Sequence, residues 1–177
     1  MGRHKVIALG DTHAPWLNKP ALDFAYEQIK KEKPDYIVQI GDAYDFYSAS
    51  KFPRDHSVMT PAEELEQGRD ALCDLWRHIG KIAPKAKRIQ LMGNHCHRPV
   101  KRMREQAPSL EPLLAIGIRA MFKFDGVTTC FDPREEVMID DVMYIHGYTK
   151  MGVAARTHSI NVVCGHTHRG YTYFERL

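Results

Sequence analysis

Short apolar runs that end at a glycine recur along the chain, and polar residues follow each of them. Their letters are KVIALG, DYIVQIG, KRIQLMG, VMYIHG and NVVCG, at residues 5–10, 35–41, 87–93, 142–147 and 161–165. The runs are rich in Val and Ile and are bounded by glycine, which is typical of buried strands. We therefore predict a strand at each of these five runs.

Helical patterns occupy the two segments between the first three runs. The first pattern begins at Asn18, a residue type that caps helices, and ends before Pro34. The second begins at Thr60, where Glu63 stands three residues later as in a capping box and apolar residues follow at helical spacing. The order strand, helix, strand, helix, strand favours a parallel sheet with right-handed crossover connections.

The pattern changes in the second half of the chain. Residues 97–123 predict a basic helical segment that is broken at Pro108 and near Gly117. The runs GVTTCF, EEVMI and VMYIHG follow as short strands, and Asp140–Asp141 between the last two is a suitable hairpin turn. We predict that these strands build a second, mixed sheet.

The composition is that of a soluble globular protein. The chain has 177 residues, of which 44% are hydrophobic and 27% are charged, so we expect a single domain over residues 1–177. A net charge of +3 argues only weakly for an anionic partner, and no apolar run is long enough for a signal peptide or a membrane span. The four cysteines are scattered without a CxxC pair, which favours reduced thiols and a cytoplasmic location.

Residues that carry chemistry gather directly after the predicted strands. The set consists of carboxylates, imidazoles and one amide: Asp11, His13, Asp42, Asp45, Asn94, His95, His146, His166 and His168. The carboxyl ends of strands in an open α/β sheet form its ligand crevice, so five strand ends can deliver all of these groups to one place.

The residue types in this set point to metal chemistry. Carboxylate, imidazole and amide oxygen together suit a borderline divalent metal such as Mn, Fe, Zn or Ni. Seven plausible ligands are too many for one tetrahedral site, and they suit two metals about 3.5–4 Å apart that share a bridging carboxylate. Each motif alone also fits a simple turn or helix cap, and it is their conjunction that favours a metal centre.

These motifs resemble those of the calcineurin-like metallophosphoesterases, including small members from prokaryotes and phages. The family pattern is DxH, GDxxD, GNH, a lone His after a strand, and GHxH. Here the matching stretches are GDTH at 10–13, GDAYD at 41–45, GNH at 93–95, IHG at 145–147 and GHTH at 165–168. The resemblance implies an α/β fold, a four-layer αββα sandwich of two mixed sheets flanked by helices.

The resemblance also implies a role for each site residue. Asp11, His13 and His168 would hold one metal, Asn94, His146 and His166 the other, and Asp42 would bridge both. A hydroxide shared by the two ions would attack phosphorus, with His95 as the general acid and Asp45 as its acidic partner. We expect two divalent ions, with Mn favoured and Fe, Zn, Ni or Mg as alternatives.

Three departures from the family pattern refine this expectation. Cys96 follows GNH where relatives often carry an acid, and we predict that it is a packed loop residue. Phe46 follows Asp45 where protein phosphatases of the superfamily have Arg, which argues against a phosphoprotein substrate. The sequence ends nine residues after His168, which suggests a shortened C-terminus in which residues 170–177 supply one strand.

Two segments bear on the substrate. Arg98, Lys101 and Arg102 would share one face of a helix directly after His95, where they could bind a phosphate ester or steer a polyanion such as nucleic acid. The same residues also fit a solvated basic helix. Residues 44–56 interleave aromatic and cationic side chains, which could stack bases or simply cover the core.

The sequence thus leads to a phosphodiesterase as the first hypothesis, with nucleic acid as one candidate substrate. A phosphomonoesterase acting on a small phosphate is the second hypothesis, and a non-enzymatic interaction scaffold on the same fold is the third. We expect no membrane partner, and the sequence leaves the oligomeric state open.

Overall fold

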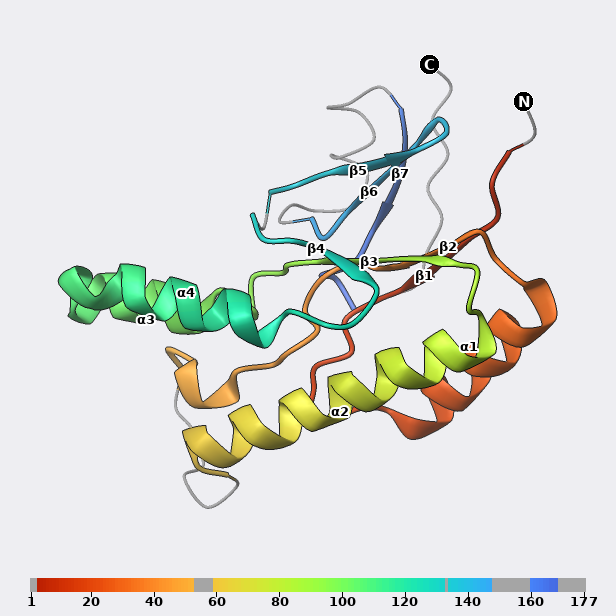
Figure 1. Ribbon diagram of the computed structural model, residues 1–177. Coiled ribbons are helices and arrows are strands. Elements are labelled where there is room, and N and C mark those ends of the chain that lie inside the picture. Colours follow the sequence, from red (N-terminus) through yellow and green to blue (C-terminus); the bar gives the residue numbers. More distant parts are fainter. Residues whose placement is uncertain (1–2, 53–58, 133, 148–159, 169–177) are drawn as a thin grey trace.

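The computed structural model describes residues 3–52, 59–132, 134–147 and 160–168. Its elements follow the chain from an N-terminal strand to a C-terminal strand (Figure 1). In order, they are β1 (Val6–Leu9), α1 (Lys19–Glu32), β2 (Tyr36–Gln39), η1 (Tyr47–Ala49), α2 (Pro61–Ile82), β3 (Lys87–Leu91), α3 (Arg98–Gln106), η2 (Pro108–Leu110), α4 (Glu111–Met121), β4 (Val127–Cys130), β5 (Val137–Ile139), β6 (Val142–Ile145) and β7 (Asn161–Cys164).

The first sheet is parallel throughout and has the strand order β1-β2-β3-β4. The predicted parallel arrangement of the first three strands is therefore confirmed. The run GVTTCF forms β4, which pairs with β3 instead of joining the second sheet, so that part of the prediction is wrong. The segment between β3 and β4 holds α3 and α4 and is long enough for the crossover that a parallel neighbour requires.

The second sheet is mixed, as predicted, and has the order β5-β6-β7. The strands β5 and β6 form an antiparallel hairpin, whose turn contains Asp140 in the left-handed region at φ 53°. The strands β6 and β7 are parallel. Their carboxyl ends therefore lie at the same edge of the sheet, next to each other.

The layers are held together by two hydrophobic clusters on opposite faces of the first sheet. Ile37 of β2 packs with Leu72 and Ile79 of α2 in one cluster. Its neighbour Val38 packs with Tyr144 of β6 in the other. Parallel strands buried on both faces read as continuous apolar runs, which is the pattern that predicted them.

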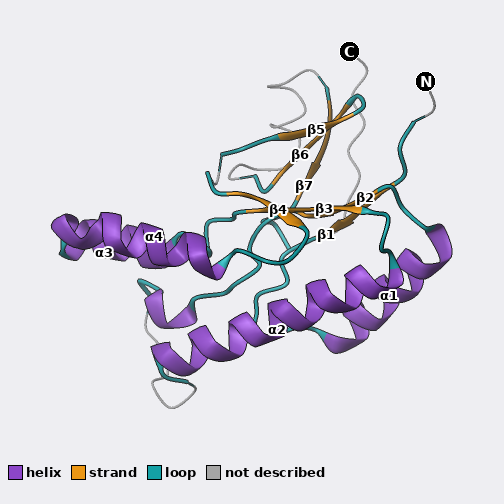
Figure 2. Cartoon of the chain, viewed as in Figure 1, coloured by secondary structure: helices purple, strands orange, loops and turns teal. Residues whose placement is uncertain are grey.

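The architecture is α/β, with two sheets and accompanying helices (Figure 2). The two sheets with flanking helices that the resemblance implied are confirmed, and the described residues form three of its four layers. The helices α1 and α2 cover one face of the first sheet, and the second sheet lies against the other face (Figures 1 and 2).

Both predicted early helices form with the predicted caps. Asn18 Oδ1 accepts a hydrogen bond from the Ala21 N–H at 3.0 Å at the start of α1. Thr60 and Glu63 form a complete capping box at the start of α2. Such a cap stabilises a helix by about 1 kcal/mol.

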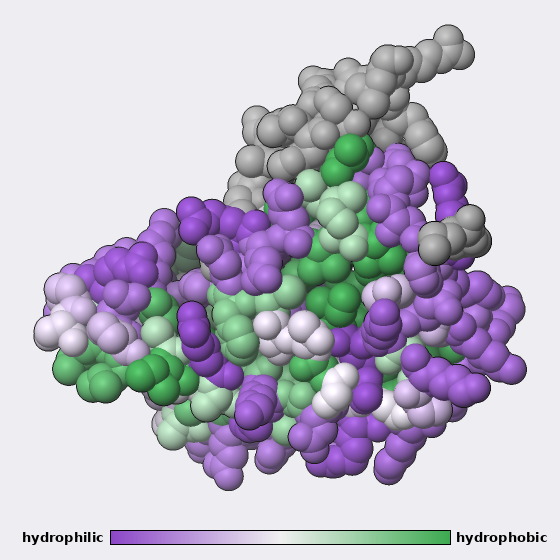
Figure 3. Space-filling view, turned by 45° about the horizontal axis from the view of Figure 1, so that its top comes forward, coloured by the Kyte–Doolittle hydropathy of each residue, from purple (hydrophilic) through white to green (hydrophobic). Residues whose placement is uncertain are grey.

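The helices α3 and α4 form a hairpin that projects beside the first sheet (Figure 1). The chain breaks at Pro108 as predicted, but α4 runs through Gly117 without interruption, so the predicted break there is wrong. One glycine costs a helix only about 1 kcal/mol, which the packing of Ile118 in the core offsets. Leu113 and Ile116 are each 67% exposed, and hydrophobic surface is visible at this end of the molecule (Figure 3).

Two further expectations can be compared with the structure. All four cysteines are unpaired, in agreement with the prediction of free thiols. No helix in the described part of the chain has the length and apolar character needed to cross a membrane. The strand expected at residues 170–177 lies outside the described residues, as does Arg54 in the segment 44–56 of aromatic and cationic side chains.

Candidate metal centre and active site

Turns that follow five strands bring the predicted site residues together. Asp11 and His13 follow β1, Asp42 and Asp45 follow β2, Asn94 and His95 follow β3, His146 follows β6, and His166 and His168 follow β7. Their ligand atoms form three groups, each within 4.8 Å: Asp11, His13 and His168; His13, Asp42 and His95; and Asp42, His146 and His166. Because the groups share His13 and Asp42, they form one continuous centre.

Asp42 lies at the middle of this centre and is 1% exposed. Its Oδ1 accepts a hydrogen bond from the His95 backbone N–H at 2.8 Å. Its buried Oδ2 has no hydrogen-bond partner of acceptable geometry, although His146 Nε2 lies 3.2 Å away. Burial alone would raise the pKa of Asp42, but neighbouring His146 and His95 hold it below its usual range. The carboxylate is therefore ionised, with one oxygen free to bind a cation.

His146 is fully buried and its ring is oriented by the backbone. Its Nδ1 lies 3.0 Å from the carbonyl oxygen of Ile40, and since a carbonyl only accepts, Nδ1 carries the proton. In the neutral ring, Nε2 then presents a lone pair toward Asn94 Oδ1 at 3.0 Å and Asp42 Oδ2 at 3.2 Å. Three acceptor atoms that face one another are the arrangement that a metal ion satisfies.

Without an ion, the same cluster favours a proton on His146. Burial lowers the pKa of this histidine, but the adjacent Asp42 carboxylate raises it more, and the net shift is upward. The pKa of His166 shifts the other way, because burial and the nearby His146 both disfavour its charged form. Without a metal, the pKa of His146 is thus raised while that of His166 is lowered. A divalent ion would bind both rings in their neutral form.

His13 and His168 face each other at the other end of the centre. His13 Nδ1 lies 2.9 Å from Asp45 Oδ1, so it donates there and leaves Nε2 as the lone-pair atom. That Nε2 lies 3.0 Å from His168 Nε2. Two nitrogens about 2.1 Å from one metal and at a right angle to each other would be about 3 Å apart, so the spacing fits a shared ion.

Asp11 connects the two ends of the centre. Both of its carboxylate oxygens accept from the His166 backbone N–H, at 3.0 and 3.1 Å. Its Oδ1 also lies 3.8 Å from His146 Nδ1. The donor set of carboxylate, imidazole and amide oxygen, with its converging lone pairs, therefore fits divalent metal ions.

His95 lies beside the metal centre and is held by Asp45 and Arg98. Its Nδ1 is 2.7 Å from Asp45 Oδ1, and its Nε2 is 2.8 Å from Arg98 Nη2. Arg98 Nη1 also donates to the Asp45 carbonyl oxygen at 2.9 Å. Burial alone would raise the pKa of Asp45, but its hydrogen bonds with His13 and His95 and the charge of Arg98 hold it well below its usual range. An ionised Asp45 thus orients both imidazoles.

The backbone at these turns is unusual. The left-handed region holds five of the site residues, with φ values of 42° at Asp11, 49° at His13, 47° at Asp42, 73° at His166 and 52° at His168. Non-glycine residues in this region cluster at functional sites, where the surrounding structure imposes them. Gly93 serves the site by its lack of a side chain, because a Cβ there would lie 2.0 Å from Asp42 Oδ1.

The predicted substrate-binding residues separate into two groups. Arg98 lies in the site, as described above. Lys101 is exposed and Arg102 Nη1 lies 4.0 Å from Glu105, and within the described residues neither contacts a member of the metal centre.

Two residues that the sequence singled out serve packing. Cys96 is fully buried, and burial raises the pKa of its thiol to about 12, as expected of a packed loop residue. Phe46 is 4% exposed and stacks on Tyr44 with ring centroids 5.0 Å apart. These two aromatic rings of the loop therefore cover the core, whereas Phe52 is 65% exposed.

The sequence did not single out Glu64 or the carbonyl of Ile40. Glu64 is 1% exposed and accepts hydrogen bonds from the backbone N–H groups of Tyr47 and Ser48, the latter at 2.8 Å, which fixes the turn after Asp45. The helical spacing could have pointed to Glu64, because a residue four positions before Gly68 lies on the same, buried face of α2. The Ile40 carbonyl gives no such signal, because every residue has one.

Comparison with known proteins places the chain in a family. The family model described as calcineurin-like phosphoesterase matches residues 4–170. The chain is 24% identical over 183 residues to the "Gene 54 protein" of Mycobacterium phage L5, in an alignment that covers 93% of this chain and 69% of the phage protein. No solved structure matches the chain. The chain therefore belongs to the calcineurin-like phosphoesterase family.

Proposed function

We propose that this metal-dependent phosphoesterase is a two-metal phosphodiesterase. The observation that carries the proposal is the position of Asp42, which belongs to two groups of convergent ligand atoms and keeps one buried oxygen without a hydrogen bond. A carboxylate between two sets of ligands is what a pair of ions about 3.5–4 Å apart requires.

We assign the metal ligands by their position around Asp42. Asp11, His13 and His168 would hold one ion, and Asn94, His146 and His166 the other. When bound, two divalent ions supply Lewis acidity, which lowers the pKa of water in the site and offsets negative charge on the phosphate oxygens. We propose Mn as the native ion, with Fe, Zn, Ni and Mg as the alternatives to be compared.

We assign His95 to the proton that the leaving oxygen needs. Hydrolysis of a phosphodiester replaces one ester P–O bond by a bond to a water oxygen, and the departing alkoxide must take up a proton. Because Asp45 holds Nδ1 of His95, the Nε2 atom is the one available to exchange a proton with the substrate. Asp45 orients the ring and does not itself transfer the proton.

We assign Arg98 to a phosphate oxygen of the substrate. Its guanidinium already lies at His95 Nε2, which is the edge of the site where the leaving group would be. A planar guanidinium can grip two oxygens of one phosphate, so substrate would draw it away from the imidazole and free Nε2 for proton transfer. The exposed Lys101 and the half-buried Arg102 lie farther along α3 and would contact only a longer substrate, for which nucleic acid is our candidate.

The charge of the site supports a diester substrate. Among the described residues, Arg98 is the one arginine or lysine that contacts His95 or Asp45, and Phe46 is buried in the core where an arginine would add a second cation. A diester carries one negative charge, whereas a monoester carries about two at neutral pH. The unpaired cysteines support a reducing compartment, which we take to be the cytoplasm.

The test is hydrolysis of bis-p-nitrophenyl phosphate by protein loaded with Mn, Ni or Mg, compared with p-nitrophenyl phosphate under the same conditions. We expect the diester to be the better substrate. His95→Ala should lower the rate by about 10²–10⁴-fold with both ions retained, and Asp42→Asn should lower both activity and metal content. Faster hydrolysis of the monoester would make the protein a phosphomonoesterase, and full activity in Asp42→Asn would refute the two-metal assignment.

A further inference from the structure

A cavity of about 490 Å³ lies at the edge of the first sheet opposite the metal centre. It is lined by the second half of α2, by Arg88 near the start of β3 and by the turn at Gly126 before β4. The metal centre follows the carboxyl ends of the strands, whereas this cavity lies at their amino ends. The two sites therefore do not share any residue.

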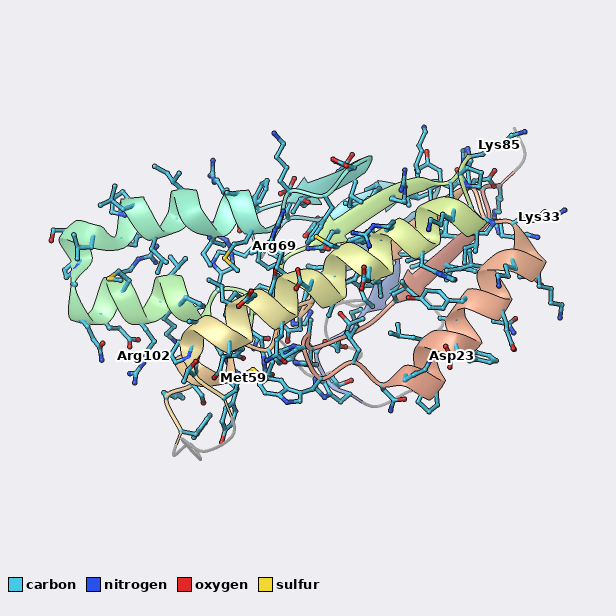
Figure 4. The ribbon with its side chains drawn as sticks, turned by 60° about the horizontal axis from the view of Figure 1, so that its bottom comes forward. Asp23, Lys33, Met59, Arg69, Lys85 and Arg102 are labelled. Carbon is cyan, nitrogen blue, oxygen red and sulfur yellow. The ribbon has the colours of Figure 1, made fainter. Side chains whose placement is uncertain are left out.

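The lining of this cavity is strongly cationic. It contains five basic side chains, Arg69, Arg77, Lys81, Arg88 and Lys123, and one acidic side chain, Asp125. Two of the basic residues are already engaged. Arg69 lies between α2 and α4 and donates to carbonyl oxygens at the end of α4 (Figure 4). Arg77 contacts Asp74.

The other three basic residues, Lys81, Arg88 and Lys123, form no salt bridge within the described residues. Arg88 is the most constrained of them. Its Nε is buried and has no hydrogen-bond partner. A buried donor without an acceptor is unfavourable, and it is normally found where water or a ligand supplies one.

Two glycines make the space that the Arg88 guanidinium occupies. A Cβ at Gly80 of α2 would lie 2.6 Å from Nη1, and a Cβ at Gly126 would lie 2.5 Å from Nη2. Both contacts are closer than real Cβ atoms approach. The two glycines thus hold the planar guanidinium group in a narrow slot. Because the group is already fixed, binding an anion would cost less conformational entropy.

We propose that this cavity binds a small phosphorylated molecule, which it recognises through a phosphate group held by Arg88, Lys81 and Lys123. A guanidinium fork with lysines beside it matches the geometry and charge of a phosphate. The volume suits a ligand of mononucleotide size or smaller. Trp76 and Phe124 also line the cavity, but they are 2% and 7% exposed, so they offer little surface for stacking a base. Recognition therefore rests on the phosphate.

The test is isothermal titration of metal-loaded protein with inorganic phosphate and with AMP. Because the proposed metal centre would also bind phosphate, Asp42→Asn serves as the background in which that second binding event is weakened. We expect Arg88→Gln to weaken the remaining binding by about tenfold or more, since a charged hydrogen bond is lost. The matched control is Arg77→Gln, which removes a cavity arginine that already has an acidic partner and should change the affinity less than about twofold.

Hydrolysis of bis-p-nitrophenyl phosphate separates this proposal from the proposed activity. Arg88→Gln should leave the hydrolysis rate unchanged, because Arg88 lies outside the metal centre. If Arg88→Gln does not fold, Arg88→Lys and Lys123→Gln test the same cavity, and each should still weaken binding. Equal affinity of all variants would overturn the proposal. So would Arg88-dependent binding of a single-stranded oligonucleotide by a protein that binds neither phosphate nor AMP.

Discussion

Asp45 joins two functions in a single carboxylate oxygen. Its Oδ1 lies 2.9 Å from His13 Nδ1 and 2.7 Å from His95 Nδ1. One imidazole is a proposed metal ligand and the other is the proposed general acid, so a single carboxylate oxygen orients both rings. A change at Asp45 should therefore disturb metal binding and proton transfer together, whereas a change at Arg98 should weaken substrate binding and leave metal binding unchanged.

The lowered pKa of Asp45 predicts how stability depends on pH. A carboxyl group whose pKa is depressed by folding contributes stability above its unfolded pKa of about 3.9 and loses that contribution as the pH falls. The free energy of unfolding of metal-free wild-type protein should thus decrease as the pH falls from 5 to 2, and below pH 4 the slope for one proton taken up should approach about 1.4 kcal/mol per pH unit. Asp45→Asn should flatten this slope.

Urea denaturation at a series of pH values measures this dependence. Asp23→Asn is the control, because Asp23 is exposed on α1 and pairs only with Lys19 on the helix surface. Its slope should match that of the wild type. If Asp45→Asn has the same slope as both, then the paired state of Asp45 does not contribute to acid stability.

The two histidines of GHTH are predicted to serve different ions. His168 lies with Asp11 and His13, whereas His166 lies with Asp42 and His146. His168→Ala and His166→Ala should each lower the content from two ions to about one per chain. His168→Ala combined with His13→Ala should still retain one ion, and His168→Ala combined with His146→Ala should retain none. Elemental analysis after gel filtration measures the number of metal ions per chain. Loss of both ions from either single variant would contradict the assignment of His166 and His168 to different ions.

The sequence predicted which residues meet, and it could not predict how they are held. Each of the predicted ligands stands directly after a strand, and the rule that strand ends converge is enough to group them. The orientation of His146 depends on the carbonyl of Ile40, and the position of His95 depends on an arginine three residues later. These contacts require the path of the chain in space, which residue types alone do not specify.

At the scale of elements, replacing a glycine by alanine should change the free energy of unfolding in opposite directions, depending on whether there is space for the added methyl group. Gly117 lies exposed inside α4, and a Cβ there would meet nothing within 4 Å. Gly117→Ala should raise the free energy of unfolding by about 0.5–1 kcal/mol, because alanine is the better helix former. Gly93→Ala should lower it by about 1–3 kcal/mol and reduce activity, since the added methyl group would displace the Asp42 carboxylate.

Thermal or urea denaturation of the two variants, beside the activity assay, checks this pair. A stabilised Gly117→Ala with unchanged hydrolysis would agree with a continuous α4. A destabilised Gly117→Ala would instead favour the break in the helix that the sequence suggested.

The errors at the level of elements have a common physical origin. The composition of GVTTCF correctly predicts a strand. Its pairing with β3, however, depends on the crossover through α3 and α4, which brings the chain back beside β3. Similarly, Gly117 weakens a helix locally, and the burial of Ile118 next to it outweighs that effect. Local patterns predict the type of an element well, whereas its partners and its ends depend on tertiary packing.

At the scale of the whole molecule, the proposed metal centre joins the two sheets. Asp11, Asp42 and Asn94 follow strands of the first sheet, whereas His146, His166 and His168 follow strands of the second. The two sheets also meet in a hydrophobic cluster around Val38 and Tyr144. Ions bound across this boundary would add contacts that only the folded chain can make.

Removal of the ions should therefore lower the stability of the entire protein. A ligand that binds only the folded state stabilises it by about 2.7 kcal/mol when its concentration is 100 times the dissociation constant. Treatment with EDTA should lower the midpoint of thermal unfolding by several degrees, and added Mn should restore it. Asp42→Asn should show a much smaller difference between the two conditions, because it lacks the proposed bridge. Gly117→Ala, which changes a helix far from the centre, should keep the full difference. An unfolding midpoint that does not respond to EDTA in metal-loaded wild-type protein would mean that ions do not link the sheets.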